Sequence, residues 1–508
     1  MKIFFYLIIL VVKCLVYPPV FAEEKSRNET EHAKAEAPKE EIVITNHSLK
    51  LVSGELKYTA TAGTMNIKNN QGNVKASIFY VAYVKEGVEE NSSRPITFCF
   101  NGGPGSSSVW LNLGVFGPRR ILFDDKGYPV IPYTLVDNDY SLLEHTDLVF
   151  IDPVSTGYSR AAPGEDVKQF HGVDEDIKSV AEFIRLYTNR HTRWESPKFL
   201  AGESYGTTRA AGLAGHLHDN QHLYLDGIIL VSSVLNFQTI GFSQVGNDLP
   251  YILFLPSYTA AAWYHKKLSP DLMKDRARTF KEVQDFALHE YSQALMLGDR
   301  LETKQRDLVV QKLAKYTGLS PDYVDRSGLR VNIYRFVKEL LRDERRTIGR
   351  FDCRVKGIDS DSCGETFDYD PSYDAVAGAF AATFNTYIRT ELDYKRDEEY
   401  MILANVWPWN FGNATNQYLN VSETLREVMN KNPLMRVFVS SGYYDLATPY
   451  FAADYTFAHL GLDPSLRDHV EMRLYEGGHM MYTVKDTLAK MKGDLSQFIN
   501  RAVALKNP

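Results

Sequence analysis

Short runs of apolar residues recur along the chain, separated by amphipathic stretches. The runs cover residues 96–100, 148–151, 199–201, 227–231 and 436–439. Strands that are apolar on both faces are typical of a parallel sheet covered by helices on each side. Residues 173–191 space their apolar positions by about 3.6, which predicts an amphipathic helix. This alternation predicts an α/β fold class with a doubly wound, mostly parallel sheet.

The middle third of the chain has a different pattern. From about residue 237 to residue 400 it is mostly helical and charged. Ser269 and Ser320 each precede a proline, an arrangement that suits the start of a helix. We predict a helical insertion that forms a cap over the site. The predicted parts are core residues 42–236, the cap insertion 237–400 and core residues 401–508.

The amino terminus has the features of an export signal. Lys2 is followed by an apolar run over residues 3–12, and the segment ends at the small residue Ala22. Ten apolar residues suit a signal peptide and are too few for the roughly 20 that span a bilayer. We predict a signal peptide at 1–22, with an uncleaved anchor as the alternative, and a flexible charged leader at 23–41. The expected location is periplasmic or extracellular, or vacuolar or lysosomal in a eukaryote.

Composition narrows the class of protein. The 508 residues are 44% hydrophobic and 24% charged, with a net charge of −7, which fits a folded protein without a basic nucleic-acid surface. We expect no nucleic acid and no membrane contact beyond the signal peptide, and the oligomeric state stays open. Four cysteines do not make a disulfide scaffold. Cys353 and Cys363 are close enough in sequence for a local disulfide, whereas Cys99 lies in an apolar run and should be a buried thiol.

Gly202-Glu203-Ser204-Tyr205-Gly206 follows one apolar strand and precedes a helical stretch. A strand, a tight turn and a helix form the setting in which a serine nucleophile is presented at a sharp elbow. The glycines give room for close backbone approach. Ser204 is therefore the candidate nucleophile.

A serine hydroxyl needs a base, and the base needs an orienting acid. Asp445 follows the strand at 436–439, and His479 follows a strand-like segment at 470–475. The order Ser, Asp, His is the one this strand–turn–helix arrangement requires. The alternative cluster of His216, His218 and His222 is interpreted as a solvated helix end, so no metal and no cofactor are expected.

Asn101-Gly102-Gly103-Pro104-Gly105 comes directly after the strand at 96–100. Glycine-rich loops can cradle phosphates, but the lysine of a phosphate-binding loop is missing here. In a hydrolase with a nucleophile elbow, such a loop and the residue after the nucleophile supply backbone N–H groups to the oxyanion. Gly103 and Tyr205 are the predicted donors.

The chain resembles the serine carboxypeptidase family (peptidase family S10), and looks like its bacterial branch. The matching segments are residues 101–107, 152–159, 202–206, 441–445 and 478–480. The resemblance implies an α/β-hydrolase fold and removal of single residues from peptides with free C-termini. It also implies that Asn101, the Gly102 N–H and Glu203 bind the terminal carboxylate. Glu203 would do so only by sharing a proton, because two bare carboxylates repel.

The chain also departs from many members of this family. Cys99 stands where many have Trp, Ser106 where many have Cys, and residues 113–116 lack a second acid found shortly before the next Gly-Pro. The triad is unaffected, but carboxylate binding and its pH dependence should differ. An esterase or acyltransferase on the same triad is the alternative function, and a non-catalytic binding protein is a third.

Overall fold

A ten-stranded sheet forms the centre of the computed structural model, which describes residues 37–88 and 93–504. The strands lie in the order β1-β2-β3-β7-β4-β9-β10-β13-β14, and β8 pairs with β3 beside this path. Their bounds are β1 Ile42–Leu51, β2 Gly54–Lys68, β3 Val74–Lys85, β4 Ile96–Phe100, β7 Asp147–Ile151, β8 Arg160–Ala161, β9 Lys198–Glu203, β10 Gly227–Val231, β13 Arg436–Gly442 and β14 Val470–Tyr475.

The sheet is parallel from β7 to β14 and antiparallel from β1 to β7. The apolar runs seen in the sequence fall on β4, β7, β9, β10 and β13, which are buried on both faces. The predicted α/β class with a mostly parallel sheet is confirmed. The antiparallel end consists of long strands joined by short turns, which need no crossover helix.

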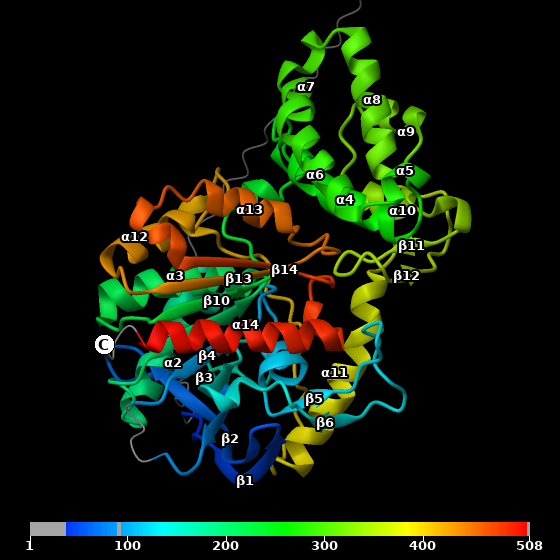
Figure 1. Ribbon diagram of the computed structural model, residues 1–508. Coiled ribbons are helices and arrows are strands. Elements are labelled where there is room, and N and C mark those ends of the chain that lie inside the picture. Colours follow the sequence, from blue (N-terminus) through cyan, green and yellow to red (C-terminus); the bar gives the residue numbers. More distant parts are fainter. Residues whose placement is uncertain (1–36, 89–92, 505–508) are drawn as a thin grey trace, which may run out of the picture. The chain divides into compact units, whose positions relative to one another are not determined.

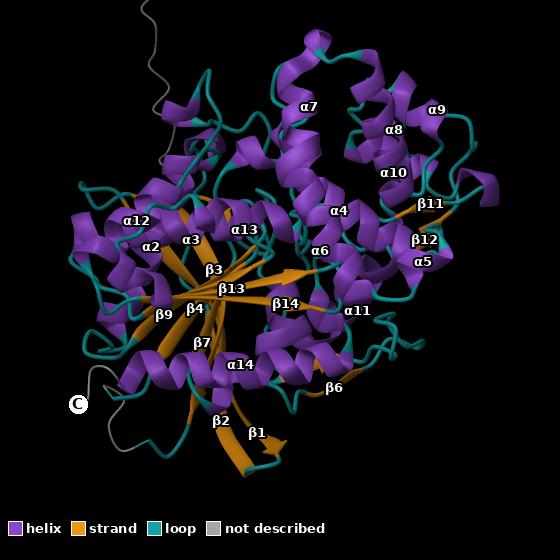
Figure 2. Cartoon of the chain, turned by 45° about the horizontal axis from the view of Figure 1, so that its top comes forward, coloured by secondary structure: helices purple, strands orange, loops and turns teal. Residues whose placement is uncertain are grey.

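Helices cover both faces of the sheet (Figure 2). Along β4, Phe98 and Phe100 pack into one apolar cluster and Cys99 into the other, as the alternation of a strand requires. The first cluster is closed by α2 (Val173–Arg190), α3 (Tyr205–Gln221) and α12 (Ser422–Lys431), and the second by α1 (Val109–Leu111), α11 (Pro371–Thr390) and α14 (Lys485–Ala504).

A third apolar cluster lies among the helices of the middle segment, which Figure 1 shows grouped beside the sheet. These helices are α4 Leu249–Tyr264, α5 Pro270–Met273, α6 Arg276–Phe286, α7 Ser292–Leu297, α8 Thr303–Thr317, α9 Pro321–Arg326 and α10 Ile333–Glu339. Their cluster includes Tyr444 and Leu446, which follow β13, and Tyr450 of α13 (Tyr450–Ala458). In contrast, α11 packs on the sheet, although it lies inside the segment predicted as the cap.

Two short hairpin-like pairs complete the regular structure of the described residues. β5 (Arg119–Ile121) pairs with β6 (Leu135–Asp137), and β11 (Thr347–Ile348) pairs with β12 (Lys356–Gly357). The second pair leads directly into the segment at 350–351 that reaches the site described below. Residues 350 and 351 lie in the loop that joins these two strands.

The last residues of the predicted flexible leader are held against the core. The Glu40 carboxylate accepts two hydrogen bonds from Arg190 at 2.7 and 3.0 Å and one from the Asn66 N–H at 2.8 Å. The Pro38 carbonyl accepts from the Asn66 side chain. The predicted flexible leader therefore ended too late in the sequence, because Glu40 has partners in the fold that composition alone does not show. The predicted signal peptide and residues 23–36 lie outside the described residues.

The three described cysteines are free thiols. Cys99 and Cys353 are buried, and burial raises the pKa of both, whereas Cys363 is exposed. The disulfide suggested for Cys353 and Cys363 is not formed, because the buried residue and the exposed one do not meet. Among the described residues, none of the helices is long and apolar enough to span a bilayer.

A buried ion pair ties α2 to α3 beneath the loop after β4. The Arg209 guanidinium donates to Asp176 at 2.7 Å and also to the Asn101 carbonyl, and both side chains of the pair are almost fully buried. Burial raises the pKa of Asp176, and the Arg209 charge opposes that rise. Arg209 thus fixes the backbone position of a predicted site residue.

We expect Asp176→Asn to reduce the free energy of unfolding by about 3–5 kcal/mol, because it leaves Arg209 buried without a counter-charge. Urea unfolding measures the change. The matched control is Glu182→Gln on the same helix, whose partly exposed pair with Arg185 should contribute less than about 1 kcal/mol. Equal effects of the two substitutions would show that the buried pair does not stabilise the fold.

Candidate active site

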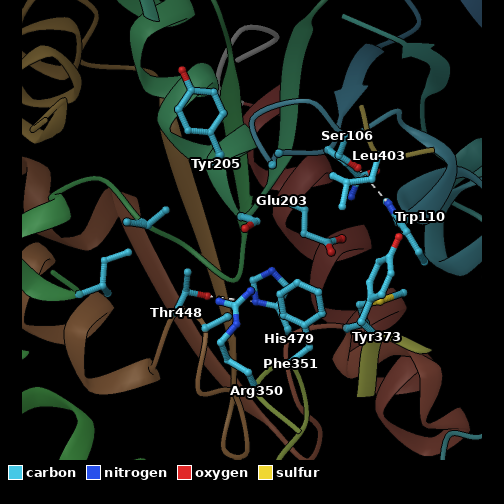
Figure 3. Close-up of a pocket in the computed structure, with 18 of the residues that line it drawn as sticks. Ser106, Trp110, Glu203, Tyr205, Arg350, Phe351, Tyr373, Leu403, Thr448 and His479 are labelled. Atoms are coloured by element: carbon cyan, nitrogen blue, oxygen red, sulfur yellow. Dashed lines mark hydrogen bonds between the residues drawn. The ribbon is translucent and has the colours of Figure 1, made fainter. Parts of the chain in front are cut away.

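The residues proposed from the sequence meet at the carboxyl ends of the parallel strands. Ser204 follows β9, Asp445 follows β13 and His479 follows β14, while the loop starting at Asn101 follows β4. The carboxyl edge of such a sheet is where α/β proteins bind ligands. Ser204, His479 and the loop line one pocket, which Figure 3 shows in close-up. Asp445 does not line the pocket but pairs with the His479 imidazole.

Ser204 occupies a strained turn between β9 and α3. Its φ of 59° and ψ of −129° lie outside the regions that a serine ordinarily adopts. The turn is tight, because a Cβ on Gly202 would lie 2.1 Å from the Gly206 carbonyl oxygen. Tyr205 begins α3, so its N–H belongs to the first turn, where helical N–H groups have no partner within the helix. The expected elbow is present.

The His479 imidazole is paired with a buried carboxylate. Its Nδ1 lies 2.8 Å from Asp445 Oδ2 and 3.2 Å from Thr448 Oγ1. The other carboxylate oxygen accepts the N–H groups of Ala447 and Thr448 at 2.7 and 3.0 Å, and Thr448 Oγ1 donates to Oδ2 at 2.8 Å. Asp445 is therefore held by its own turn and aimed at the imidazole, which fixes the proton on Nδ1 and leaves Nε2 as the basic nitrogen.

Phe351 also holds His479 in place, through its ring and through its backbone carbonyl. Phe351 stacks on it with ring centroids 4.8 Å apart, and the His479 N–H donates to the Phe351 carbonyl at 2.6 Å. Burial would lower the pKa of His479, but the charge of Asp445 and its hydrogen bond outweigh burial and raise that pKa above the ordinary value. Glu203 adds to the rise and Arg350 opposes it.

The glycine loop lies directly on the elbow. A Cβ on Gly102 would be 2.4 Å from the Tyr205 nitrogen, so only glycine allows this approach. Gly103 has a φ of 102° and lines the pocket at an exposed position. Asn101 is buried, and its Oδ1 accepts the Leu111 N–H at 3.1 Å. The two predicted oxyanion donors and the predicted carboxylate ligands thus face the same small region.

Glu203 is a buried carboxyl group within this region. Burial is the largest influence and raises the pKa of Glu203 to about 7, against the charge of His479 and hydrogen bonds from Tyr482 and Asn101, which lower it. Tyr482 donates its hydroxyl proton to Glu203 Oε2 at 2.8 Å. A carboxyl with this raised pKa is mostly protonated in mildly acidic solution and ionises around neutral pH.

Tyr482 occupies the space beside the residues that lack the second acid of many family members. A Cβ on Gly114 would lie 2.5 Å from Tyr482 Cε2, so the ring fits because residue 114 is glycine. Burial raises the pKa of the Tyr482 phenol well above its ordinary value, and the phenol remains a donor at every working pH. A neutral hydroxyl, rather than a second carboxyl, is the partner of Glu203 here.

Sequence reasoning missed several residues that form the pocket wall or support it from behind. Thr448 follows Asp445 by three residues, a spacing typical of side-chain-capped turns that offered a signal. Tyr482 follows His479 by three residues, but its contact with Glu203 depends on the tertiary fold. The wall also contains Trp110, Arg350, Phe351 and Tyr373.

The histidine cluster considered as a metal site is separate from this pocket. Within residues 37–88 and 93–504, no group of three or more His, Cys, Asp or Glu side chains is arranged to hold an ion. The histidines considered as an alternative lie at the end of α3, where His218 Nδ1 is 2.9 Å from Asp219. Ser204, His479 and Asp445 can act as nucleophile, base and orienting acid, with backbone N–H groups beside them.

Known proteins resemble parts of this chain. The family model described as serine carboxypeptidase matches residues 52–492. Serine carboxypeptidase-like 29 of Arabidopsis thaliana is 32% identical over 132 residues, which cover 25% of this chain and 26% of that protein. Serine carboxypeptidase-like 45 of the same plant is 30% identical over 180 residues, covering 32% of this chain and 34% of that protein. The chain therefore matches only about a quarter to a third of the length of these relatives. Its assignment to a bacterial branch stays a prediction.

A solved structure shows the same fold. Kex1(Δ)p, a prohormone-processing carboxypeptidase from Saccharomyces cerevisiae, aligns with a TM-score of 0.55 at 15% identity, covering 87% of this chain and 91% of that chain. At that identity the likeness is evidence for the fold and not for the activity. The predicted α/β-hydrolase fold is confirmed. With the family model matching most of its length, the chain belongs to the serine carboxypeptidase family.

Proposed function

We propose that the protein is a serine carboxypeptidase that removes the last residue from peptides with a free C-terminus. One observation carries the proposal: the pocket that holds Ser204 and His479 also holds Glu203, a buried carboxyl that is neutral below about pH 7. A neutral acid beside a nucleophile can donate to a peptide's terminal carboxylate. A hydrolase that accepts only neutral esters has no use for such a group.

Acylation begins when Ser204 Oγ adds to the carbonyl carbon of the last peptide bond and His479 Nε2 takes the serine proton. Asp445 stabilises the imidazolium that forms. The backbone N–H groups of Gly103 and Tyr205 donate to the carbonyl oxygen as it becomes negative. His479 then gives the proton to the departing amine, and the C-terminal amino acid leaves.

Deacylation follows the same path with water. His479 takes a proton from the water as it adds to the acyl carbon, and returns it to Ser204 as the ester bond breaks. The shortened peptide leaves and the free enzyme is restored. Every proton that moves between Ser204, water and the departing amine passes through the one imidazole that Asp445 and Phe351 hold in place.

The terminal carboxylate binds on the far side of the scissile bond. Asn101 and the Gly102 N–H donate to it, and protonated Glu203 donates through the oxygen that Tyr482 does not occupy. With the terminal carboxylate bound there, only one peptide residue fits between that carboxylate and the bond that Ser204 attacks. The enzyme is therefore an exopeptidase rather than an endopeptidase.

We also propose that residues 237–400 cap the site and that the protein is exported. Arg350, Phe351 and Tyr373 of this segment line the pocket, which supports a covering role. The apolar cluster of its helices includes Tyr444 beside Asp445. The export proposal rests on the signal-like residues 1–22.

At pH 6, kcat/KM for an N-blocked dipeptide with a free C-terminus should exceed that for its C-terminal amide by roughly 100-fold or more, because the amide loses charge-assisted hydrogen bonds worth about 1.5–3 kcal/mol each. Steady-state hydrolysis measures both substrates. Labelling of Ser204 by a fluorophosphonate is the control for an active nucleophile.

Equal rates on the free acid and the amide, with Ser204 labelled, would overturn the exopeptidase proposal and favour an esterase or acyltransferase. Absence of labelling in the folded protein would instead favour the non-catalytic alternative. The two outcomes are distinguishable, because labelling requires only the nucleophile and its base.

A further inference from the structure

The pocket contains one permanent cation that the proposed mechanism does not use. Among the described residues that line it, Arg350 is the only lysine or arginine. Its guanidinium lies over the Phe351 ring, 4.6 Å from the centroid, and Phe351 in turn stacks on His479. This stack places a positive charge beside the reacting centre.

The nearest carboxylate does not satisfy that charge. Asp370 Oδ2 is 3.9 Å from Arg350 Nε, too long for a hydrogen bond. The Asp370 oxygens instead accept the N–H groups of Arg350, Phe351 and Ser372 and the Ser372 hydroxyl, as the cap of α11. Within the described part of the chain, the Arg350 guanidinium donates no hydrogen bond, and its side chain is 34% exposed. Its N–H groups are therefore available to a ligand.

Arg350 has different contacts from the groups proposed for the terminal carboxylate. Its guanidinium is stacked on Phe351, which in turn stacks on the His479 imidazole, and these three side chains are labelled in Figure 3. The charge of Arg350 opposes the rise in the pKa of His479, whereas the groups that act most on the pKa of Glu203 are His479, Tyr482, Asn101 and Asp445. Arg350 therefore lies on the side of the pocket next to the base, where its N–H groups are open to a substrate side chain.

We propose that Arg350 binds the carboxylate of an aspartate or glutamate side chain next to the cleaved bond, and so makes acidic residues preferred there. The proposal rests on the proposed carboxypeptidase function. A planar guanidinium pairs with a carboxylate through two parallel hydrogen bonds, and stacking on Phe351 holds its plane in place. The acidic residue is the last or the penultimate one of the peptide.

The test compares N-blocked peptides that differ only as Glu or Gln, at the last position in one pair and at the penultimate position in the other. At pH 6 a glutamate side chain is ionised while Glu203 is protonated. We expect the wild-type Glu/Gln ratio of kcat/KM to be on the order of 10 to 100 at one of the positions. Arg350→Gln should bring that ratio to about one, and Arg350→Lys should keep part of it.

Arg346→Gln is the matched control, because Arg346 is exposed and does not line this pocket, and it should keep the wild-type ratio. A wild-type ratio near one at both positions would overturn the proposal. So would an Arg350→Gln variant that loses activity equally on Glu and Gln peptides, since Arg350 would then serve the terminal carboxylate or the imidazole.

A binding measurement separates this inference from the function on which it rests. Calorimetry on Ser204→Ala, with and without Arg350→Gln, measures the affinity for the Glu and Gln peptides without turnover. Tighter binding of the Glu peptide that depends on Arg350 supports the site even if no peptide is hydrolysed by the wild type. Equal affinities for the two peptides would overturn it even in an active carboxypeptidase.

Discussion

Ser204→Ala should lower kcat for free-acid peptides by about 10⁴- to 10⁶-fold, because the hydroxyl is the atom that forms the acyl-enzyme bond. The substitution removes one partly exposed oxygen from a turn, so the protein should fold as before. His479→Ala should lower kcat by a similar factor, since nucleophile and base act as a unit. The double variant should be hardly worse than either single one.

Stopped assays with high enzyme concentration measure the residual rates, and thermal unfolding provides the control for folding. His218→Ala is the matched histidine control, because His218 lies at the end of α3 outside the pocket and should leave kcat unchanged. Retention of more than about one tenth of the activity by Ser204→Ala would refute the assignment of the nucleophile.

The second large effect concerns Glu203 and pH. Burial raises the pKa of Glu203 to about 7, so the carboxyl is protonated below that pH and donates to the substrate carboxylate. Above pH 7 it ionises, and two carboxylates then repel in a dry site. KM for free-acid peptides should therefore rise by about tenfold per pH unit above 7, while kcat on the acid side should follow the deprotonation of His479.

Glu203→Gln should remove this rise in KM, because an amide donates at any pH. Tyr482→Phe should move the rise to higher pH, since loss of the donated hydrogen bond favours neutral Glu203. KM and kcat measured from pH 5 to 9 provide the comparison. An unchanged KM–pH curve in Glu203→Gln would show that Glu203 is not the proton partner of the substrate.

The sequence predicted those parts of the molecule that depend on local pattern. Strand β4 is apolar on both faces. Its run could be recognised from the sequence because a strand buried on both faces is a short, continuous stretch of apolar residues. The glycines around Ser204 were recognisable for a similar reason, since the elbow is a local turn. Asp445 and His479 could be assigned because they follow Ser204 in the sequence in the order that this sheet topology requires.

The parts that escaped depend on packing between distant segments. Tyr482 meets Glu203 across 279 residues of chain, and neither residue's neighbours in sequence signal the contact. The Arg350 N–H is bonded to Asp370 at the start of α11, and composition did not distinguish this sheet-packed helix from the other helices of the middle segment. Glu40 was included in the predicted flexible leader, although Arg190 is its partner in the fold.

The tyrosine that fits against Gly114 has a consequence for proton stoichiometry. Two interacting carboxyls titrate in two coupled steps, and binding an anion between them takes up a fractional and variable number of protons. Here the second partner is a phenol that keeps its proton, so only Glu203 exchanges one. Above neutral pH each peptide bound therefore brings one proton from solvent into the pocket, and each amino acid released returns it.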